Sequence, residues 1–441
     1  DHGAIRAAMT AAAASRKPSL IACKTVIGFG APTLAGTAKT HGAPLGDDEI
    51  AGARAALGWD AAPFTLPQDV KDAWAAAGTR SLVAYDAWHE RLAQSPKQKR
   101  FNAAIAGEMP VKLGKAMKAY RQTLKDDALK LATRQSSQKA LEVINAATDM
   151  TVGGSADLTG SNLTKTGDMM PVTPGKYKGR YVHFGIREHG MSAAMNGMAL
   201  HGGLVPYGGT FMVFTDYARG AIRLSALMKQ RVIYVMTHDS IGLGEDGPTH
   251  QPVEHLAMMR ATPNVNVFRP ADAVEVAEAW EIALNSAETP SLLALSRQGT
   301  PTLRHEKGHE NLTMKGGYVL REAGGPRDVT LMATGTEVAL AMAAADELKE
   351  KYALHAAVVS MPCWELFDAQ DDAYKASVLG DAPRVAVEAA IGFGWEKYTG
   401  ENGDFVGMTR FGESAPAGAL YEYFNITAEA VVAKAVALIQ S

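Results

Sequence analysis

The stretch Thr237–Glu254, THDSIGLGEDGPTHQPVE, follows the apolar run Val232–Met236 and decides how the rest of the chain is interpreted. A short β-branched and aromatic run bounded by polar residues is typical of a buried strand in a parallel sheet. The stretch after it is too rich in glycine for a helix, and its glycines let the backbone approach a ligand closely. Its polar side chains include His238, Asp246 and His250. Because ligands of open α/β sheets bind beyond the carboxyl ends of strands, an active-site loop is predicted.

The same loop also fits a plainer interpretation, in which it is glycine-rich and merely solvated. Solvated loops seldom concentrate groups that titrate near neutrality, however. With THDSIGLG followed by GEDGPTHQPVE, the stretch resembles the thiamine diphosphate loop of transketolases. The resemblance runs from CKTVIGFG and THGAPLG near the start of the chain to SMPCWELFDAQ and FGESAP near its end. It implies an α/β fold of consecutive domains with mostly parallel sheets, a thiamine diphosphate-binding fold followed by a C-terminal α/β domain.

The composition is that of an ordinary globular protein: 441 residues, 47% hydrophobic and 21% charged, which is enough for two or three domains. A net charge of −3 gives no basic face for nucleic acid or for an anionic membrane. The longest apolar run, around Ser19–Cys23, is too short to span a bilayer, and no signal segment precedes it. Only Cys23 and Cys363 could form a disulfide, and they lie far apart in sequence, so a reducing cytoplasm is expected.

Three domains are predicted, and their boundaries are 1–108, 109–312 and 313–441. The first is interpreted as the tail of a diphosphate-binding domain followed by a linker. It begins with a predicted helix, Ile5–Ala14, and a strand, Leu20–Lys24, and continues with alanine-rich helices from Asp48 to Pro110. Since this α/β unit lacks its first strands and Asp1 replaces an initiator methionine, a cut or processed chain is expected.

The loop Gly28–Gly46 carries a single histidine, His41. A lone histidine in a polar loop is usually just exposed, but the resemblance implies that His41 faces the substrate and takes part in catalysis. Transketolases hold the diphosphate through a metal ion, here expected to be Mg²⁺ or Ca²⁺, bound by a Gly-Asp-Gly motif. No Gly-Asp-Gly occurs in this sequence. No metal ligand is therefore assigned within the chain, and the ligands are expected in a preceding segment.

The second domain alternates predicted helices and strands. The helices are Lys112–Leu131, Gln135–Ala147 and Gly190–Leu200, and the strands are Thr151–Gly153, Val182–Phe184, Val265–Phe268 and Leu292–Leu295. Glu188 lies between a strand and a helix, where a plain helix-start acid is stabilised by the helix dipole. The resemblance instead assigns Glu188, in REHGM, to the aminopyrimidine ring of thiamine diphosphate. There the glutamate promotes the imino tautomer that generates the thiazolium ylide.

Three aromatic residues in TFMVFTDY recur at three-residue spacing, namely Phe211, Phe214 and Tyr217. By default such a pattern is one buried face of a helix. The resemblance implies that these rings enclose the aminopyrimidine, which is compatible because a cofactor can cap a core. It also places Asp157, in GGSADL, near the cofactor.

Arg297 follows a predicted strand, where a guanidinium suits either bidentate phosphate binding or a structural ion pair. The resemblance favours the phosphate. It implies that the sugar phosphate is bound by Arg134, Ser161, His238 and Arg297. It further implies that Asp246 accepts a hydrogen bond from a substrate hydroxyl and that His250 and His41 move protons at the sugar.

From Gly316 onward a β-α-β pattern predicts a third, mostly parallel domain. Its strands are Val329–Met332, Ala357–Ser360 and Val385–Val387. Thr334 and Glu337 are spaced as a capping box for a helix that ends near Glu350. No dense cluster of acids or histidines is visible there, so a structural or dimer-supporting domain is expected.

The reaction that the resemblance implies is transfer of a two-carbon ketol unit through the thiamine diphosphate ylide and an enamine, as in the pentose phosphate pathway. The donor would be a ketose phosphate such as xylulose 5-phosphate and the acceptor an aldose phosphate such as ribose 5-phosphate. A homodimer is implied, because in this family two subunits together enclose the cofactor. The alternatives are a dihydroxyacetone synthase-like ketol transferase, or a fragment that binds but is inactive without its diphosphate-binding half. Decarboxylating relatives are less favoured because they need no sugar-phosphate arginines.

Overall fold

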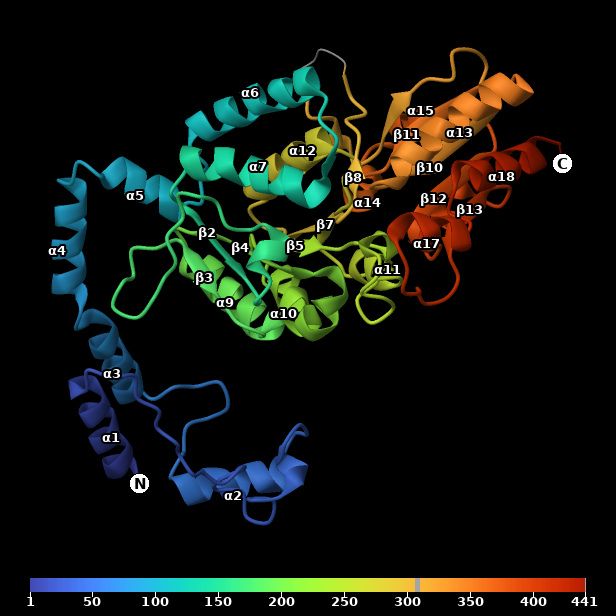
Figure 1. The fold of residues 1–441 in the computed structure, drawn as a ribbon. Helices are drawn as coiled ribbons and strands as arrows, with labels where there is room; N and C mark the ends of the chain where they lie inside the picture. Colours follow the sequence, from blue (N-terminus) through green and yellow to red (C-terminus); the bar gives the residue numbers. More distant parts are fainter. Residues whose placement is uncertain (306–309, 441) are drawn as a thin grey trace. The chain divides into compact units, whose positions relative to one another are not determined.

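The computed structural model describes residues 1–305 and 310–440, and these divide into two compact units, Asp1–Ser95 and Pro96–Ser441 (Figure 1). The first unit is helical: α1 (His2–Ala14), η1 (Ala38–Thr40), α2 (Asp47–Leu57), α3 (Gln68–Thr79) and α4 (Leu82–Ala93). Ala31 is its only buried residue, so the first unit has no hydrophobic core of its own. The strand predicted at Leu20–Lys24 is wrong. No strand of the first unit is available to pair with it, and an unpaired strand would leave its backbone groups unsatisfied.

The second unit contains a six-stranded sheet in the order β3-β2-β4-β5-β7-β6, in which every pair is parallel. Its strands are β2 (Thr151–Ser155), β3 (Tyr181–His183), β4 (Val205–Phe211), β5 (Ile233–Thr237), β6 (Asn266–Phe268) and β7 (Ser291–Leu295). The strands that the sequence predicted in this domain are confirmed to within two residues. The strand before the key loop is β5, and all five of its residues are buried.

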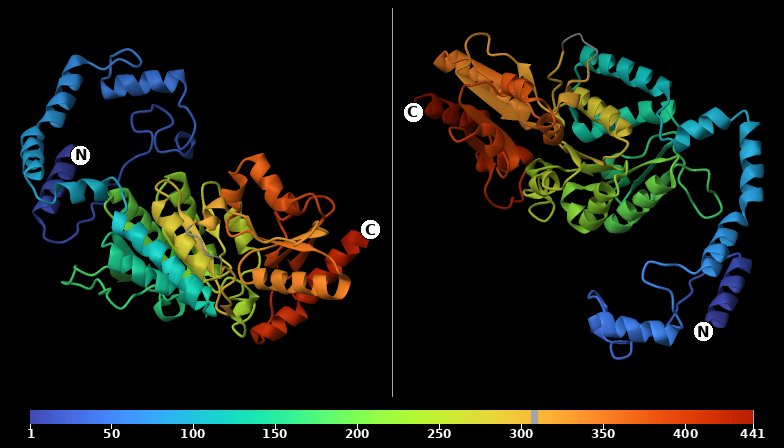
Figure 2. Two further views of the ribbon diagram at one scale, coloured as in Figure 1. Left: turned by 90° about the horizontal axis from the view of Figure 1, so that it is seen from above. Right: turned by 180° about the vertical axis from the view of Figure 1, so that it is seen from behind.

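Helices cover both faces of the six-stranded sheet (Figure 2). Residues Ile233 and Val235 pack with α6 (Val111–Asp127), α7 (Thr133–Ala147) and α12 (Ala273–Asn285). Tyr234 and Met236 point the other way and pack with α9 (Glu188–His201), α10 (Thr215–Leu227) and α11 (His255–Arg260). Burial on both faces explains why β5 has a continuous apolar sequence and does not alternate.

A second sheet, in the order β13-β12-β10-β11-β9, follows in the chain, and only β9 is antiparallel. Its strands are β9 (Tyr318–Arg321), β10 (Val329–Ala333), β11 (Ala356–Ser360), β12 (Arg384–Ile391) and β13 (Asp404–Met408). It packs against α13 (Glu337–Tyr352) and α18 (Ala428–Gln440). The mostly parallel sheet predicted after Gly316 is therefore confirmed.

The remaining elements are short. They are α5 (Gln98–Ile105), β1 (Leu131–Ala132), α8 (Thr159–Asn162), η2 (Met212–Phe214), η3 (Ile241–Leu243), β8 (Gly299–Thr300), η4 (Leu312–Lys315), α14 (Trp364–Asp368), α15 (Asp372–Leu379), α16 (Glu396–Thr399) and α17 (Ala417–Tyr423). The strands β1 and β8 form an antiparallel pair. The helix predicted to end at Leu131 ends at Asp127 instead.

A buried charge network, formed by Arg269, Asp239, Glu337, Glu388 and Arg260, joins the two sheets. The fully buried Arg269 donates from Nε to Asp239 Oδ2 at 3.0 Å and from Nη1 to Glu337. Arg260 donates two hydrogen bonds to Glu388, at 2.8 and 2.7 Å. Glu337 and Glu388 are far apart in sequence and are brought to the same arginine only by the fold.

The predicted capping box at Thr334 and Glu337 is also wrong. The cap of α13 is Thr336, and it makes no side-chain cap hydrogen bond. Thr334 Oγ1 accepts from Arg269 at 3.0 Å and donates to Glu388. The Thr334 hydroxyl thus forms hydrogen bonds with residues distant in sequence and does not cap the start of α13.

Candidate functional site

The carboxyl ends of five parallel strands meet at one edge of the six-stranded sheet, and the predicted site residues follow these ends. Asp157 and Ser161 follow β2, Glu188 follows β3, Phe211 ends β4 with Phe214 and Tyr217 after it, His238, Asp246 and His250 follow β5, and Arg297 follows β7. This arrangement agrees with the general position of ligand sites in such sheets.

Two arginines are brought to this edge by the small β1–β8 pair. Thr133 and Ser296 join the segments, since Thr133 N donates to Ser296 Oγ at 3.0 Å. The half-buried Arg134 donates from Nη1 to the backbone oxygen of Ser161 at 2.7 Å. Burial and the positive charge of Arg297 lower the pKa of Arg134, so the two guanidinium groups act on each other. A pair of neighbouring guanidiniums attracts a dianion such as a phosphate.

His238 lies buried beside these arginines, and its backbone is left-handed with φ of 61°. Its Nδ1 is 2.9 Å from Thr237 Oγ1, and its ring lies on that of Phe211 with centroids 3.8 Å apart. Burial, together with the charges of Arg134 and Arg297, lowers the pKa of His238 to about 3. The ring is therefore neutral at physiological pH.

The low pKa of His238 makes stability depend on pH in a defined direction. Below its ordinary pKa of 6.5 the unfolded chain binds a proton that the folded ring excludes. This contribution is therefore constant above pH 6.5 and is lost as the pH falls toward 3. From pH 7 to pH 5 the free energy of unfolding of the natural chain is expected to fall by about 2 kcal/mol more than that of His238→Gln. Glutamine has no ring that titrates in this range. Urea unfolding at both pH values measures this difference, and equal losses would contradict it.

Glu188 is the first residue of α9, as predicted, and it is 8% exposed. Among the described residues it has one hydrogen bond, a long one of 3.5 Å from Thr210 Oγ1. A buried carboxylate that accepts only one long hydrogen bond within the protein is suited to a ligand that carries hydrogen-bond donors.

The aromatic residues do not share one helix face, which corrects the prediction. Phe211 ends β4, Phe214 belongs to η2 and Tyr217 to α10. Their rings nevertheless form a ladder, with centroids 5.9 Å apart between Phe211 and Phe214 and 5.8 Å between Phe214 and Tyr217. Flat apolar rings at the same sheet edge as the Glu188 carboxylate fit a heteroaromatic ring such as an aminopyrimidine.

The loop after β5 is held by the segment that follows β13. Gln251 Nε2 donates to the backbone oxygens of Gly244 and Glu413, each at 2.9 Å. A Cβ on Gly412 would lie 1.6 Å from Gln251 Oε1, so a larger residue there would displace the Gln251 side chain. His250 is half-buried, and its ring lies edge-on to Phe214 with centroids 5.6 Å apart. The C-terminal segment thus fixes the loop that carries His250.

Of the predicted site residues, His41 belongs to the first unit and the others belong to the second. His41 is exposed at the end of η1. Asp157 is exposed, with φ of 62°. Sequence reasoning missed Asn162, Thr237 and Arg269, whose partners are far away in the chain.

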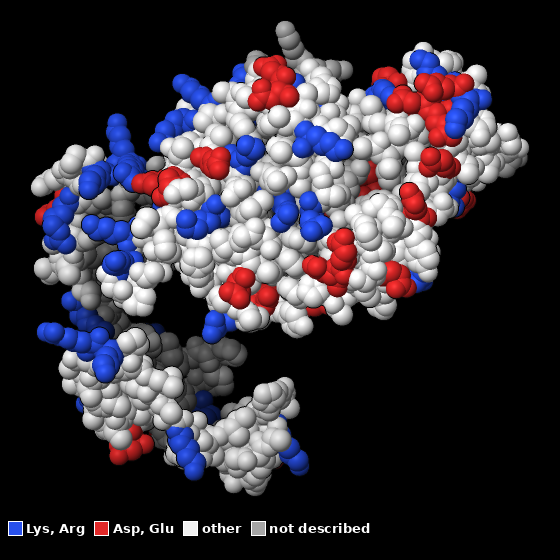
Figure 3. Space-filling view, in the orientation of Figure 1, with Lys and Arg blue, Asp and Glu red and all other residues white. Residues whose placement is uncertain are grey.

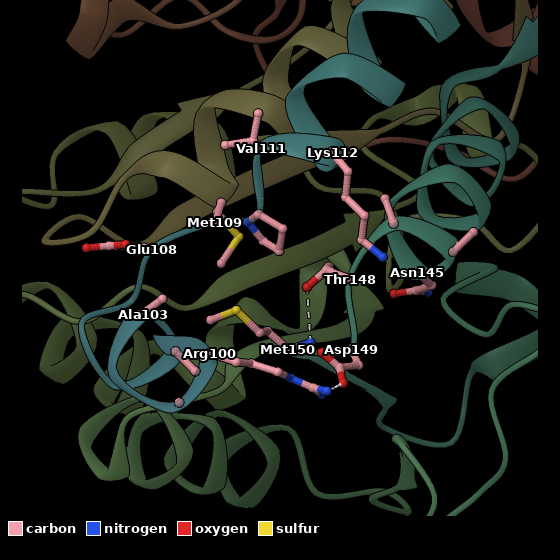
Figure 4. A pocket seen from close by; sticks show the side chains of 15 residues that line it. Arg100, Ala103, Glu108, Met109, Val111, Lys112, Asn145, Thr148, Asp149 and Met150 are labelled. Atoms are coloured by element: carbon pink, nitrogen blue, oxygen red, sulfur yellow. Dashed lines mark hydrogen bonds and ion pairs between the residues drawn. The ribbon is translucent and has the colours of Figure 1, made fainter. Parts of the chain in front are cut away.

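A cavity of about 740 Å³ lies at the opposite end of the sheet, near the start of β2 (Figure 4). Arg100 and Asp149 form an ion pair at its mouth, and Lys112 extends toward Asn145. None of the predicted site residues lines it. We therefore assign the site to the carboxyl edge.

On the face of the second unit in Figure 3, basic and acidic side chains are interspersed in small groups. Over the described ranges, none of the helices has the length and apolar character needed to cross a bilayer. The same residues contain no group of three or more metal-ligating side chains suited to holding an ion.

Three family profiles match the chain. They are the transketolase thiamine diphosphate binding domain over residues 1–110, the transketolase pyrimidine binding domain over 129–302 and the transketolase-like C-terminal domain over 316–427. Together they span nearly the whole sequence in the order of the predicted domains.

Individual relatives agree with these profiles. A transketolase from Sinorhizobium medicae is 60% identical over 100% of this chain and 63% of its own length. The transketolase structure from Leishmania mexicana is 41% identical with a TM-score of 0.90, covering 100% of this chain and 65% of that one. A Pichia stipitis transketolase mutant in complex with xylulose 5-phosphate is 38% identical with a TM-score of 0.92, with the same coverage.

The chain spans 63–66% of the length of the first three curated relatives that it matches. The three profiles and the individual relatives point the same way, and the chain belongs to the transketolase family.

Proposed function

We propose that the chain supplies the aminopyrimidine and substrate sites of a thiamine diphosphate-dependent transketolase. One observation carries the proposal: a single sheet edge holds Glu188, an aromatic ladder and the cationic pair Arg134 and Arg297. The first group suits the aminopyrimidine and the second suits a sugar phosphate. The Pichia stipitis relative that binds xylulose 5-phosphate supports a ketose phosphate as the donor.

At the cofactor, Glu188 would hydrogen-bond the aminopyrimidine ring and exchange a proton with it. Phe211, Phe214 and Tyr217 would lie against the ring and exclude water, with Asp157 nearby. Thiamine diphosphate, when bound, supplies the carbanion-stabilising centre needed to break and form the carbon–carbon bond of the ketol unit. Mg²⁺ or Ca²⁺ is proposed as the ion that accompanies its diphosphate.

At the substrate, Arg134, Ser161, His238 and Arg297 would hold the phosphate. Asp246 would accept a hydrogen bond from a sugar hydroxyl, and leaving that acceptor unpaired would cost about 1–3 kcal/mol, which favours one stereochemistry. His250 and His41 would move protons at the hydroxyl groups next to the bond that breaks. Transfer of the ketol unit to ribose 5-phosphate is the expected outcome, a step of the pentose phosphate pathway.

A homodimer is part of the same proposal. Tyr217, Leu224 and Leu227 recur at helical spacing on α10 and are 66%, 46% and 67% exposed, respectively. An apolar helix face of this kind is suited to being covered by a second subunit. A cytoplasmic location accords with Cys23 and Cys363 both being free thiols, and cell fractionation would check it.

The test is a ketol-transfer assay on purified protein whose mass in solution is measured on the same sample. Xylulose 5-phosphate and ribose 5-phosphate are supplied with thiamine diphosphate and Mg²⁺, and a seven-carbon ketose phosphate is expected from a dimeric species. Omission of thiamine diphosphate is the control. No product would favour the alternative of a fragment that is inactive without its diphosphate-binding half, and activity that elutes with a monomer would contradict the homodimer. Preference for an unphosphorylated acceptor would favour the dihydroxyacetone synthase-like alternative.

A further inference from the structure

A chain of buried hydrogen bonds leads to His238 from two strands away. Ser155 Oγ is 2.8 Å from Asn162 Oδ1, and Asn162 Nδ2 is 2.7 Å from Thr237 Oγ1. Thr237 Oγ1 in turn lies 2.9 Å from His238 Nδ1. Ser155, Asn162 and Thr237 are fully buried, so water does not compete for these bonds.

The fold leaves space for these hydrogen bonds above β4. Ser155 ends β2 and Thr237 ends β5, and β4 lies between these two strands. Gly209 of β4 has no side chain, and a Cβ there would lie 3.0 Å from Cβ of Asn162. Asn162 can therefore lie across β4 and connect its two neighbours.

The donor and the acceptor of each hydrogen bond in this series can be assigned, starting from Ser155. Ser155 Oγ accepts from the backbone N–H of Leu158 at 3.2 Å, which leaves its own proton for Asn162 Oδ1. The amide Nδ2 of Asn162 then donates to Thr237, whose single proton is left for His238 Nδ1.

The reverse order is less favourable. It would require the Asn162 amide to donate to Ser155, whose own proton would then have no acceptor among the described residues. A buried hydroxyl without an acceptor is destabilising.

A neutral imidazole whose Nδ1 accepts a hydrogen bond carries its proton on Nε2. Among the described residues no hydrogen bond to His238 Nε2 is formed, and the ring is held on the face of Phe211. The Nε2–H group is thus available as a donor to a ligand. A neutral donor next to Arg134 and Arg297 adds a hydrogen bond to an anion without adding a third repelling positive charge.

We propose that Asn162, acting through Thr237, holds His238 as the Nε2–H tautomer, so that a neutral hydrogen-bond donor faces the anionic end of the substrate. Asn162 and Thr237 are then positioning residues, since neither touches the reacting atoms. The use of this donor on a sugar phosphate rests on the proposed function, whereas the tautomer is a property of the chain itself.

The tautomer is tested by nitrogen-15 NMR of the histidine rings in the full chain, at neutral pH and without ligand. The natural chain is expected to show His238 with a proton on Nε2 only. In Asn162→Asp both side-chain oxygens accept hydrogen bonds, so Thr237 must donate to residue 162 and accept from the ring. Nδ1 of His238 is then expected to gain a proton. A proton on Nδ1 in the natural chain, or an unchanged spectrum in Asn162→Asp, would overturn the proposal.

A second variant keeps the proposal testable if the buried aspartate of Asn162→Asp prevents folding. Thr237→Val keeps the size of the side chain but removes the hydroxyl, and a mixture of the two His238 tautomers is expected. Thr151→Val is the matched control, because Thr151 is a buried threonine at the other end of the sheet whose hydroxyl donates to Asn145 at 2.7 Å. It should leave the His238 signals unchanged. A single Nε2–H form in Thr237→Val would also overturn the proposal.

Steady-state kinetics test separately whether the His238 tautomer serves to bind the phosphate of the substrate. In Thr237→Val the KM for a ketose phosphate is expected to rise about tenfold, while kcat and the KM for an unphosphorylated donor stay unchanged. If the NMR result holds and the two KM values change equally, the tautomer stands and the phosphate role of His238 is wrong. If no donor is turned over by the natural protein, the proposed function fails and the tautomer is still decided by the spectrum.

Discussion

Replacing Arg269 by methionine is expected to lower the free energy of unfolding by about 3–5 kcal/mol. Arg269 is fully buried and donates to Asp239, Glu337 and Thr334. Methionine fills a similar volume but leaves the carboxylates of Asp239 and Glu337 buried without their cation. Removing one partner of a buried ion pair is costly because the remaining charge has neither water nor a counter-ion.

The measurement is urea unfolding followed by tryptophan fluorescence, and Arg321→Met is the matched control. Arg321 pairs with Asp346 at the surface, where their side chains are 30% and 62% exposed. An exposed pair contributes less than about 1 kcal/mol. The interpretation would be contradicted if Arg269→Met lost no more stability than Arg321→Met.

A double variant tests whether the network acts as a unit. Glu337→Gln can still bond Tyr421, whose hydroxyl is 2.7 Å from Oε1, but it carries no charge. Combining it with Arg269→Met removes both the cation and one of the anions that it neutralised. The double variant is therefore expected to lose less stability than the sum of the two single variants.

The network also bears on the site. Asp239 directly follows His238, and it is held by Arg269 at the base of the loop. Further along the same loop, Gln251 bonds Glu413 from the segment after β13. The C-terminal part of the chain thus holds the loop at two points, directly through Glu413 and indirectly through Glu337, which binds Arg269. This positioning role was not predicted from the sequence.

The sequence predicted the edge of the sheet at which the candidate site lies. The run Val232–Met236 is apolar on both faces, which is specific to strands covered on both sides, and it overlaps β5. Once that strand is placed, the general rule for parallel sheets assigns the following loop to the site. Glu188 at the start of α9 was predicted in the same way, from a strand followed by a helix.

Contacts between distant segments could not be predicted in this way. Thr334 and Glu337 have the spacing of a capping box, but Arg269 and Glu388 provide Thr334 with stronger charged partners. Asn162 and Thr237 are 75 residues apart, and nothing in GSNLT or in the start of the key loop indicates their hydrogen bond. Periodicity describes one element at a time, whereas these contacts depend on how strands are ordered in the sheet.

Replacing Glu188 by glutamine is expected to lower the rate of ketol transfer about 100- to 10,000-fold. Under the proposed function, the carboxyl group exchanges a proton with the aminopyrimidine ring, and an amide of the same size cannot do so. The loss should appear in kcat, and equally for phosphorylated and unphosphorylated donors, because Glu188 is assigned to the cofactor and the arginines to the phosphate. Steady-state kinetics at saturating thiamine diphosphate measure it.

The fold itself should not suffer, and this makes the result interpretable. The amide oxygen of glutamine can still accept the 3.5 Å hydrogen bond from Thr210, and a neutral group is easier to bury than a carboxylate. The midpoint of unfolding of Glu188→Gln is therefore expected to equal or exceed that of the natural chain. Glu142→Gln, an exposed acid on α7, is the control for the chemical change. If Glu188→Gln kept more than about a tenth of the activity, proton exchange by Glu188 would be excluded as a main source of rate, because general acid–base catalysis contributes more than that.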